Sequence, residues 1–146
     1  MLFALLAACR STTTTTVNTT PAPSGNATGG SDAQAAVRGF MTAAKNQDLQ
    51  AMGALFGDTY GAARERIGRD ELEKRELIMM CYLRHDRFDV LGEAPAPNGG
   101  RAVAVSVTYK DLTRSTSFDV VRGSDNRWYV KQFDINALQD ICSRKG

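Results

Sequence analysis

Residues 101–134 read RAVAVSVTYKDLTRSTSFDVVRGSDNRWYVKQFD, and this stretch decides the fold. It predicts three consecutive strands, Arg101–Lys110, Thr113–Arg122 and Arg127–Phe133, because turn-forming residues separate them. In the first of these, valines at every second position alternate with small or polar residues. Such alternation is typical of a strand with one buried face. The stretch therefore predicts an antiparallel meander.

Helical patterns precede the meander. Apolar residues at helical spacing predict three helices, over about 32–45, 48–56 and 70–83. Asp70 and Glu73 have the spacing of a capping box at the start of the third helix. Residues 87–93 then predict a further strand, and residues 135–143 a short helix or an extended tail.

The order of these elements predicts an α+β fold. We expect three N-terminal helices to pack on one face of a curved, mainly antiparallel four-stranded sheet. From residue 32 to 133 the chain resembles the nuclear transport factor 2-like superfamily, also called cystatin-like or cone-shaped. The resemblance rests on Phe40-Met41, Asp48-Leu49, Leu55-Phe56 and Trp128-Tyr129-Val130. That superfamily includes isomerases, cyclases, transport factors and secretion components, so the resemblance implies a fold and not one function.

The N-terminus reads MLFALLAAC, and Leu6-Ala7-Ala8-Cys9 resembles the lipobox of bacterial lipoproteins. This resemblance implies a signal peptide over residues 1–8 and a lipid on Cys9. Residues 9–31 are rich in Thr, Pro, Gly and Ser and predict a disordered tether, followed by a single domain over 32–146. The alternative is a short apolar N-terminus without a lipid, because no positively charged residue precedes the apolar segment.

The charge of the chain is nearly balanced. It carries 18 basic and 16 acidic residues, and all of them except Arg10 lie at or after Ser31. No basic run is interleaved with aromatic residues, so we expect no nucleic-acid partner. One histidine and three distant cysteines have no metal-site spacing, so we also expect no metal and no cofactor.

Cys81 and Cys142 are the two cysteines that remain once the lipobox resemblance assigns Cys9 to a lipid. Disulfides persist in exported proteins, and an unpaired thiol outside the cytoplasm is a liability. We therefore predict a Cys81–Cys142 disulfide that holds the C-terminal segment against the helices. The alternative is two free or buried thiols.

The inner face of the predicted sheet has few polar groups. On strand parity it comprises Phe88, Val90, Val103, Val105, Val107, Tyr109, Phe118, Val120, Trp128 and Val130. A pocket there would be lined by Phe40, Tyr109, Thr116, Trp128 and Gln132, and would suit a small apolar ligand. The face has no carboxylate, and His85 lies in an apparently solvated connection, so we predict no catalytic residue.

The outer face of the sheet is less polar than expected for a solvated surface. Parity places Leu91, Val121, Tyr129 and Phe133 there. These residues are either a surface for a protein partner or a second copy of the chain, or scattered exposed side chains.

Together these features predict a function class. We expect a non-enzymatic binding or protein-interaction domain, tethered to a membrane of the bacterial cell envelope through its lipid. Because Arg10 and not Asp follows Cys9, we expect the outer membrane or the periplasmic side. The alternative is a small isomerase- or cyclase-type enzyme with its active site in the cone pocket.

Overall fold

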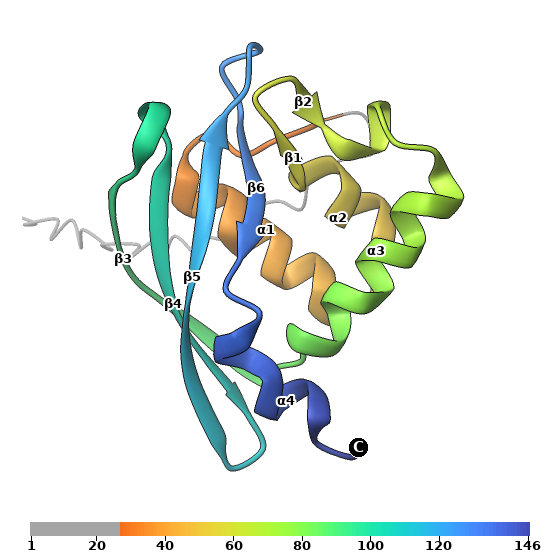
Figure 1. Cartoon of the computed structure of the whole chain (residues 1–146), viewed down its shortest axis with the longest axis vertical. Coiled ribbons are helices and arrows are strands. Elements are labelled where there is room, and N and C mark those ends of the chain that lie inside the picture. Colours follow the sequence, from red (N-terminus) through yellow and green to blue (C-terminus); the bar gives the residue numbers. More distant parts are fainter. Residues whose placement is uncertain (1–26) are drawn as a thin grey trace, which may run out of the picture.

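Four antiparallel strands form the main sheet in the computed structural model, which describes residues 27–146 (Figure 1). They are β3 (Arg87–Pro95), β4 (Arg101–Tyr109), β5 (Leu112–Arg122) and β6 (Trp128–Phe133), and they pair in that order. Val103, Val105 and Val107 of β4 are fully buried on one face, as the alternation predicts. The α+β class with a four-stranded antiparallel meander is therefore confirmed.

The turn between β4 and β5 lies one residue earlier than predicted. It consists of Lys110 and Asp111, and Lys110 adopts a positive φ of 54°. The Lys110 amide donates to Oδ2 of Asp86 at 2.7 Å, so the turn is tied to the segment that precedes β3.

Helix α1 (Ala33–Lys45) lies on the sheet and contacts all four of its strands. Asp32 caps it, since Oδ1 accepts from the Ala35 amide at 2.7 Å. Phe40 has no exposed surface, and its ring lies 6.3 Å from that of Phe56 and 6.5 Å from that of Phe118. The centre of the domain is therefore packed core.

Helices α2 (Leu49–Leu55) and α3 (Arg69–Tyr82) form an outer layer. Asp48 caps α2 as expected, but α3 begins one residue before Asp70, with Gly68 at its N-cap. The predicted capping box is absent there, because Glu73 accepts from Arg69 Nε at 2.9 Å. The main contacts of α3 are with α2 and α4 (Gln139–Ser143), so α3 is separated from most of the sheet.

Short elements complete the fold. They are the β1 (Gly57–Asp58) and β2 (Gly61–Ala62) hairpin and the 3₁₀ turns Ala63–Glu65, Pro97–Gly99 and Asn136–Leu138. Leu138 and Ile141 are fully buried in the main core. The C-terminal segment is therefore a docked helix and not an extended tail.

A β-bulge in β6 overturns part of the predicted parity. Asp119 pairs with Gln132 but Val120 pairs with Val130, which leaves Lys131 as the extra residue. After the bulge, side chains that parity placed on the inner face of the sheet lie on the outer face, and those placed on the outer face lie on the inner face. Phe133 therefore joins the core with its ring 5.4 Å from that of Phe118, and the exposed Gln132 donates to Asp119 at 2.5 Å.

Residues 28–30, which we call the N-terminal strap, lie along β6. Gly30 and Trp128 exchange two backbone hydrogen bonds, of 2.7 and 2.9 Å, and the Gly29 amide donates to Ala54 at 2.8 Å. Gly29 and Gly30, which fall within the predicted tether of residues 9–31, are thus hydrogen-bonded to the domain. Glycines hid this contact from sequence reasoning, since they have no apolar side chain whose pattern would reveal burial.

The strap covers Tyr129, which sequence parity placed on an exposed face. The Tyr129 side chain is fully buried, and its hydroxyl donates to Asp125 at 2.5 Å and lies 3.2 Å from Oγ1 of Thr28. A Cβ at Gly29, where φ is +71°, would lie 2.9 Å from the tyrosine ring. Tyr129 and Phe133 are thus absent from the predicted partner surface, which leaves an exposed Leu91 and a half-buried Val121.

The predicted signal peptide (1–8), Cys9 and the tether as far as residue 26 lie outside the described residues. Within residues 27–146, no helix has both the length and the apolar character of a membrane span.

Candidate functional site

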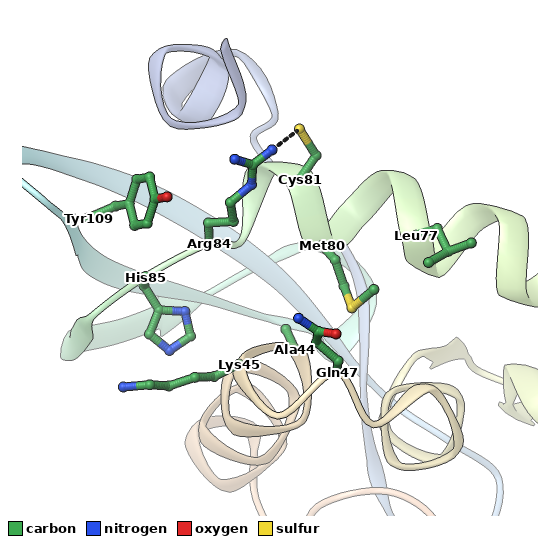
Figure 2. Close-up of a pocket in the computed structure, with 9 residues that line it drawn as sticks. All are labelled: Ala44, Lys45, Gln47, Leu77, Met80, Cys81, Arg84, His85 and Tyr109. Carbon is green, nitrogen blue, oxygen red and sulfur yellow. Dashed lines mark hydrogen bonds between the residues drawn. The ribbon is translucent and has the colours of Figure 1, made fainter. Parts of the chain in front are cut away.

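An open pocket of about 350 Å³ lies where the C-terminal ends of α1 and α3 approach β4 (Figure 2). Its lining comes from four segments of the chain and comprises Ala44, Lys45, Gln47, Leu77, Met80, Cys81, Arg84, His85 and Tyr109. Leu77 and Met80 lie toward one end beside the Gln47 amide, and His85 and Tyr109 lie toward the other (Figure 2). Such a combination is typical of small-molecule sites.

His85 is the most buried polar group of this pocket, with 7% of its surface exposed. Its Nδ1 lies 2.7 Å from the carbonyl oxygen of Leu83, and its ring packs edge-on against Phe88 with 5.3 Å between centroids. Because a carbonyl only accepts, Nδ1 carries the proton, and the neutral ring then has its lone pair on Nε2. Nε2 is buried and has no hydrogen-bond partner among the described residues.

The surroundings of His85 favour its neutral form. Burial lowers the pKa of His85 below its ordinary value, and the nearby Lys45 ammonium lowers it further. The hydrogen bond to Leu83 and the charge of Asp86 act in the opposite direction without outweighing burial. Sequence reasoning expected this segment to be solvated. It missed the burial because the covering groups, Lys45 and Phe88, come from other elements.

Lys45 and Arg84 supply positive charge at the rim of the pocket. Nζ of Lys45 donates to the Asp86 carbonyl at 2.5 Å, and Nη1 of Arg84 donates to the Arg144 carbonyl at 3.3 Å. Over residues 27–146 neither cation forms an ion pair with a carboxylate. Arg144, by contrast, is paired with Asp111.

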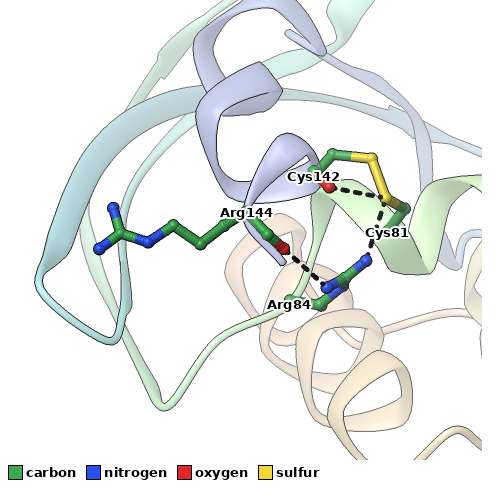
Figure 3. Close-up of a disulfide and its surroundings, with 4 residues drawn as sticks. All are labelled: Cys81, Arg84, Cys142 and Arg144. Atoms are coloured by element: carbon green, nitrogen blue, oxygen red, sulfur yellow. Dashed lines mark hydrogen bonds between the residues drawn. A yellow bond between two sulfur atoms is a disulfide. The ribbon is translucent and has the colours of Figure 1, made fainter. Parts of the chain in front are cut away.

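The predicted disulfide forms one wall of the pocket. Cys81 and Cys142 are bonded, with their Cα atoms 4.8 Å apart, and Figure 3 shows the bond joining the end of α3 to α4. Nη2 of Arg84 lies 3.4 Å from Sγ of Cys81. The disulfide and Arg84 together hold the C-terminal segment beside the pocket.

Of the five residues predicted to line a pocket, only Tyr109 lines this one. Phe40 is fully enclosed in the core and Trp128 packs against that core, so the predicted cone cavity is filled there. Thr116 is buried and donates to the Asp134 carbonyl at 3.0 Å. Gln132 is exposed because of the β6 bulge.

Glu76 is a second buried ionisable group that sequence reasoning missed. Only 1% of its surface is exposed, and Oε1 has no hydrogen-bond partner among the described residues. Burial raises the pKa of Glu76 to about 7, with smaller contributions from Glu73 and Asp48. The signal was available, since Glu76 takes an apolar-face position four residues after Leu72.

Comparisons of this chain with protein-family models, with curated proteins and with solved structures found no match. Residues 27–146 hold no cluster of three or more His, Cys, Asp or Glu side chains that could bind a metal ion.

Proposed function

We propose that this protein is an exported, membrane-tethered domain that binds a small molecule without transforming it. The binding site is the pocket between α1, α3 and β4. The single observation that carries the proposal is the pocket itself, an open cavity lined by apolar side chains together with Lys45, Arg84 and His85.

Export and tethering are supported by two features of the chain. The lipobox resemblance implies a lipid on Cys9, and the Cys81–Cys142 disulfide suits an oxidising compartment. The test is fractionation of cells that produce the wild type or Cys9→Ser. We expect the variant to leave the membrane fraction. An unmodified N-terminus in the mass spectrum of membrane-bound wild type would contradict the proposal.

Ligand binding is tested by filling the pocket. Leu77 lines the pocket and is 55% exposed, so Leu77→Trp adds bulk there without overpacking the core. Ile78, the next residue, is 62% exposed and does not line the pocket, so Ile78→Trp is the matched control. Native mass spectrometry of protein purified from its own host should show a bound mass with the wild type and Ile78→Trp, and none with Leu77→Trp. Equal occupancy of both variants would contradict the site.

The second candidate function is a small enzyme of the isomerase or cyclase type. The observation that favours it is the state of His85, a buried neutral imidazole with a free lone pair on Nε2 beside an open pocket. Such a group can remove a proton from a bound carbon acid, and Tyr109 could hydrogen-bond the oxygen that becomes negative.

The two functions differ in the fate of the captured molecule. The ligand recovered from native protein is incubated with wild type or His85→Gln in heavy water. A binding domain returns it unchanged in both cases. Deuterium uptake or rearrangement that the wild type causes and His85→Gln does not would establish the enzyme instead.

The finer fold assignment is also proposed. The order of helices, followed by a curved antiparallel meander with α1 lying across it, supports a nuclear transport factor 2-like architecture (Figure 1). An experimental structure superposed on solved members of that superfamily tests this. Helices on the opposite face of the sheet would contradict it.

A further inference from the structure

We propose that the ligand of this pocket is a small carboxylate with an apolar chain, held by its head near Lys45 and Arg84 and by its chain against Leu77 and Met80. This inference rests on the proposed binding function and names the chemical class that the site accepts.

The charges around the pocket favour an anion. Lys45 and Arg84 lie at its rim, and Lys110 lies with Nζ 5.4 Å from the centre of the Tyr109 ring. Among the described residues all three donate to backbone carbonyls and none forms an ion pair with a carboxylate. Two acidic side chains lie near these cations: Asp86, which accepts from the Lys110 amide, and Asp111, which is paired with Arg144.

Hydrogen bonds between a cation and a carboxylate are about twice as strong as bonds between neutral groups. Lys45 and Arg84 now donate to neutral carbonyls, and a ligand carboxylate would add the attraction between two full charges. Figure 2 shows His85 between the two side chains, with the Arg84 guanidinium directed toward Cys81 and the Lys45 ammonium directed the other way, so both would turn toward a shared ligand. The His85 ring between them is neutral and buried, so it adds no charge that would oppose a carboxylate.

The other half of the pocket selects for an apolar chain. Ala44, Leu77 and Met80 line it, and Leu77 leaves more than half of its surface exposed to water. Covering such a surface with hydrocarbon is favourable in proportion to the area removed from water. Methionine adapts its shape to irregular ligands, which suits chains of differing length. A bare inorganic anion would leave this half of the pocket unused.

The experiment uses three probes of matched chemistry and the full chain with the disulfide intact. Decanoate carries head and chain, 1-decanol carries the chain alone, and acetate carries the head alone. Binding is followed by NMR through shifts of the pocket residues. The variants are Lys45→Met, Arg84→Met and, as a charge-matched control far from the pocket, Lys131→Met. Thermal melts establish that each variant is folded before titration.

We expect decanoate to bind at the pocket at least about tenfold more tightly than either other probe. Lys45→Met and Arg84→Met should each weaken it fivefold or more, and Lys131→Met by less than twofold. If 1-decanol binds at the pocket as tightly as decanoate, the carboxylate assignment is overturned while the binding function stands. If decanoate shifts no pocket residue, the inference is overturned, and the proposed function is decided separately by native mass spectrometry.

Free carboxylates and membrane lipids present similar chemistry, and the same samples distinguish them. Vesicles of zwitterionic lipid with and without anionic lipid are added to the wild type and to Lys45→Met. We expect decanoate below its micelle concentration to bind without vesicles. Binding seen only with anionic vesicles would overturn the assignment to a free carboxylate.

Discussion

The carboxyl group of Glu76 lies buried between α2 and α3 with one oxygen unpartnered among the described residues. Its pKa is raised from an ordinary 4.5 to about 7, so the folded state favours the protonated acid. The folded protein is therefore most stable below pH 4.5 as far as this group is concerned, and it loses that contribution as pH rises through 7.

Glu76→Gln should remove this loss, because the amide cannot ionise. Between pH 5 and pH 8 we expect the wild type to lose about 2 kcal/mol of unfolding free energy relative to Glu76→Gln. Urea denaturation at both pH values measures the unfolding free energy of each protein. Any effect of the substitution that does not depend on pH cancels when the change from pH 5 to pH 8 is compared. Parallel pH profiles for the two proteins would contradict a buried acid at this position.

The pKa shift of His85 changes stability with pH in the opposite direction to that of Glu76. Because burial lowers the pKa of His85, the neutral ring favours the folded state. This contribution to stability is fully present above the ordinary pKa of 6.5 and is lost as the pH falls through the lower pKa of the folded state. It is the only histidine of the chain, so one ring resonance reports it by NMR. We expect a midpoint below 6.5 and ¹³C shifts of the tautomer with the proton on Nδ1. A midpoint of 6.5 or higher would mean that the ring is solvated.

The two buried groups differ in how far the sequence reveals them. Glu76 could have been found, since a carboxylate four residues after Leu72 interrupts an apolar stripe. His85 could not, since its local sequence, Arg84-His85-Asp86-Arg87, is that of a solvated connection. Its burial depends on Lys45 and Phe88, whose approach is decided by tertiary packing.

At the scale of elements, Tyr129 and Val130 make the first half of strand β6 buried on both of its faces. Val130 joins the main core, while Tyr129 points the other way and is enclosed by the N-terminal strap. Strand parity placed Trp128 on the inner face and Tyr129 on the outer face, which implies a smaller cost for Tyr129→Ala than for Trp128→Ala. The structure reverses this order, because Tyr129 is fully buried and Trp128 only partly.

We therefore expect Tyr129→Ala to destabilise the domain by about 3–5 kcal/mol, and Trp128→Ala by less. Tyr129→Phe keeps the ring and removes only the hydroxyl that donates to Asp125, so we expect a loss of about 1–2 kcal/mol. Chemical denaturation of the three variants gives the order. A Tyr129→Phe variant as stable as the wild type would show that this hydrogen bond contributes little.

Periodicity predicted where strands lie better than it predicted which way they face. The alternating valines at 103, 105 and 107 gave the correct face because β4 pairs regularly with β5. Bulges at Leu91 and Lys131 break the alternation in β3 and β6. A bulge is a property of the pairing between two strands, and the sequence of one strand does not contain it.

At the scale of the whole molecule, the disulfide joins two parts of the chain that are 61 residues apart. Closing a loop of that length restricts the unfolded chain, which on the entropy estimate stabilises the fold by about 4 kcal/mol. Unlike the bulges, this link was predicted correctly, because only two cysteines were left to pair.

The double variant Cys81→Ser, Cys142→Ser should therefore unfold at a lower denaturant concentration, by about 4 kcal/mol in free energy. We expect α4 to remain docked, since Leu138 and Ile141 are fully buried in the core. Hydrogen exchange of the α4 amides measures that docking. If those amides exchange freely in the variant, the disulfide alone holds the segment in place.

The N-terminal strap also bears on aggregation. An unpaired sheet edge is a template for strands of other molecules. The β3 edge is protected by Pro95 and by the bulge at Leu91, whereas the β6 edge is covered by bridges from Gly30 and Phe56. Removing residues 1–30 should uncover part of β6 and let the domain self-associate, while removing residues 1–26 should leave it monomeric. Light scattering at rising protein concentration compares the two truncated proteins. Self-association of the shorter one alone would mean that the residues just before α1 protect the domain against fibre formation.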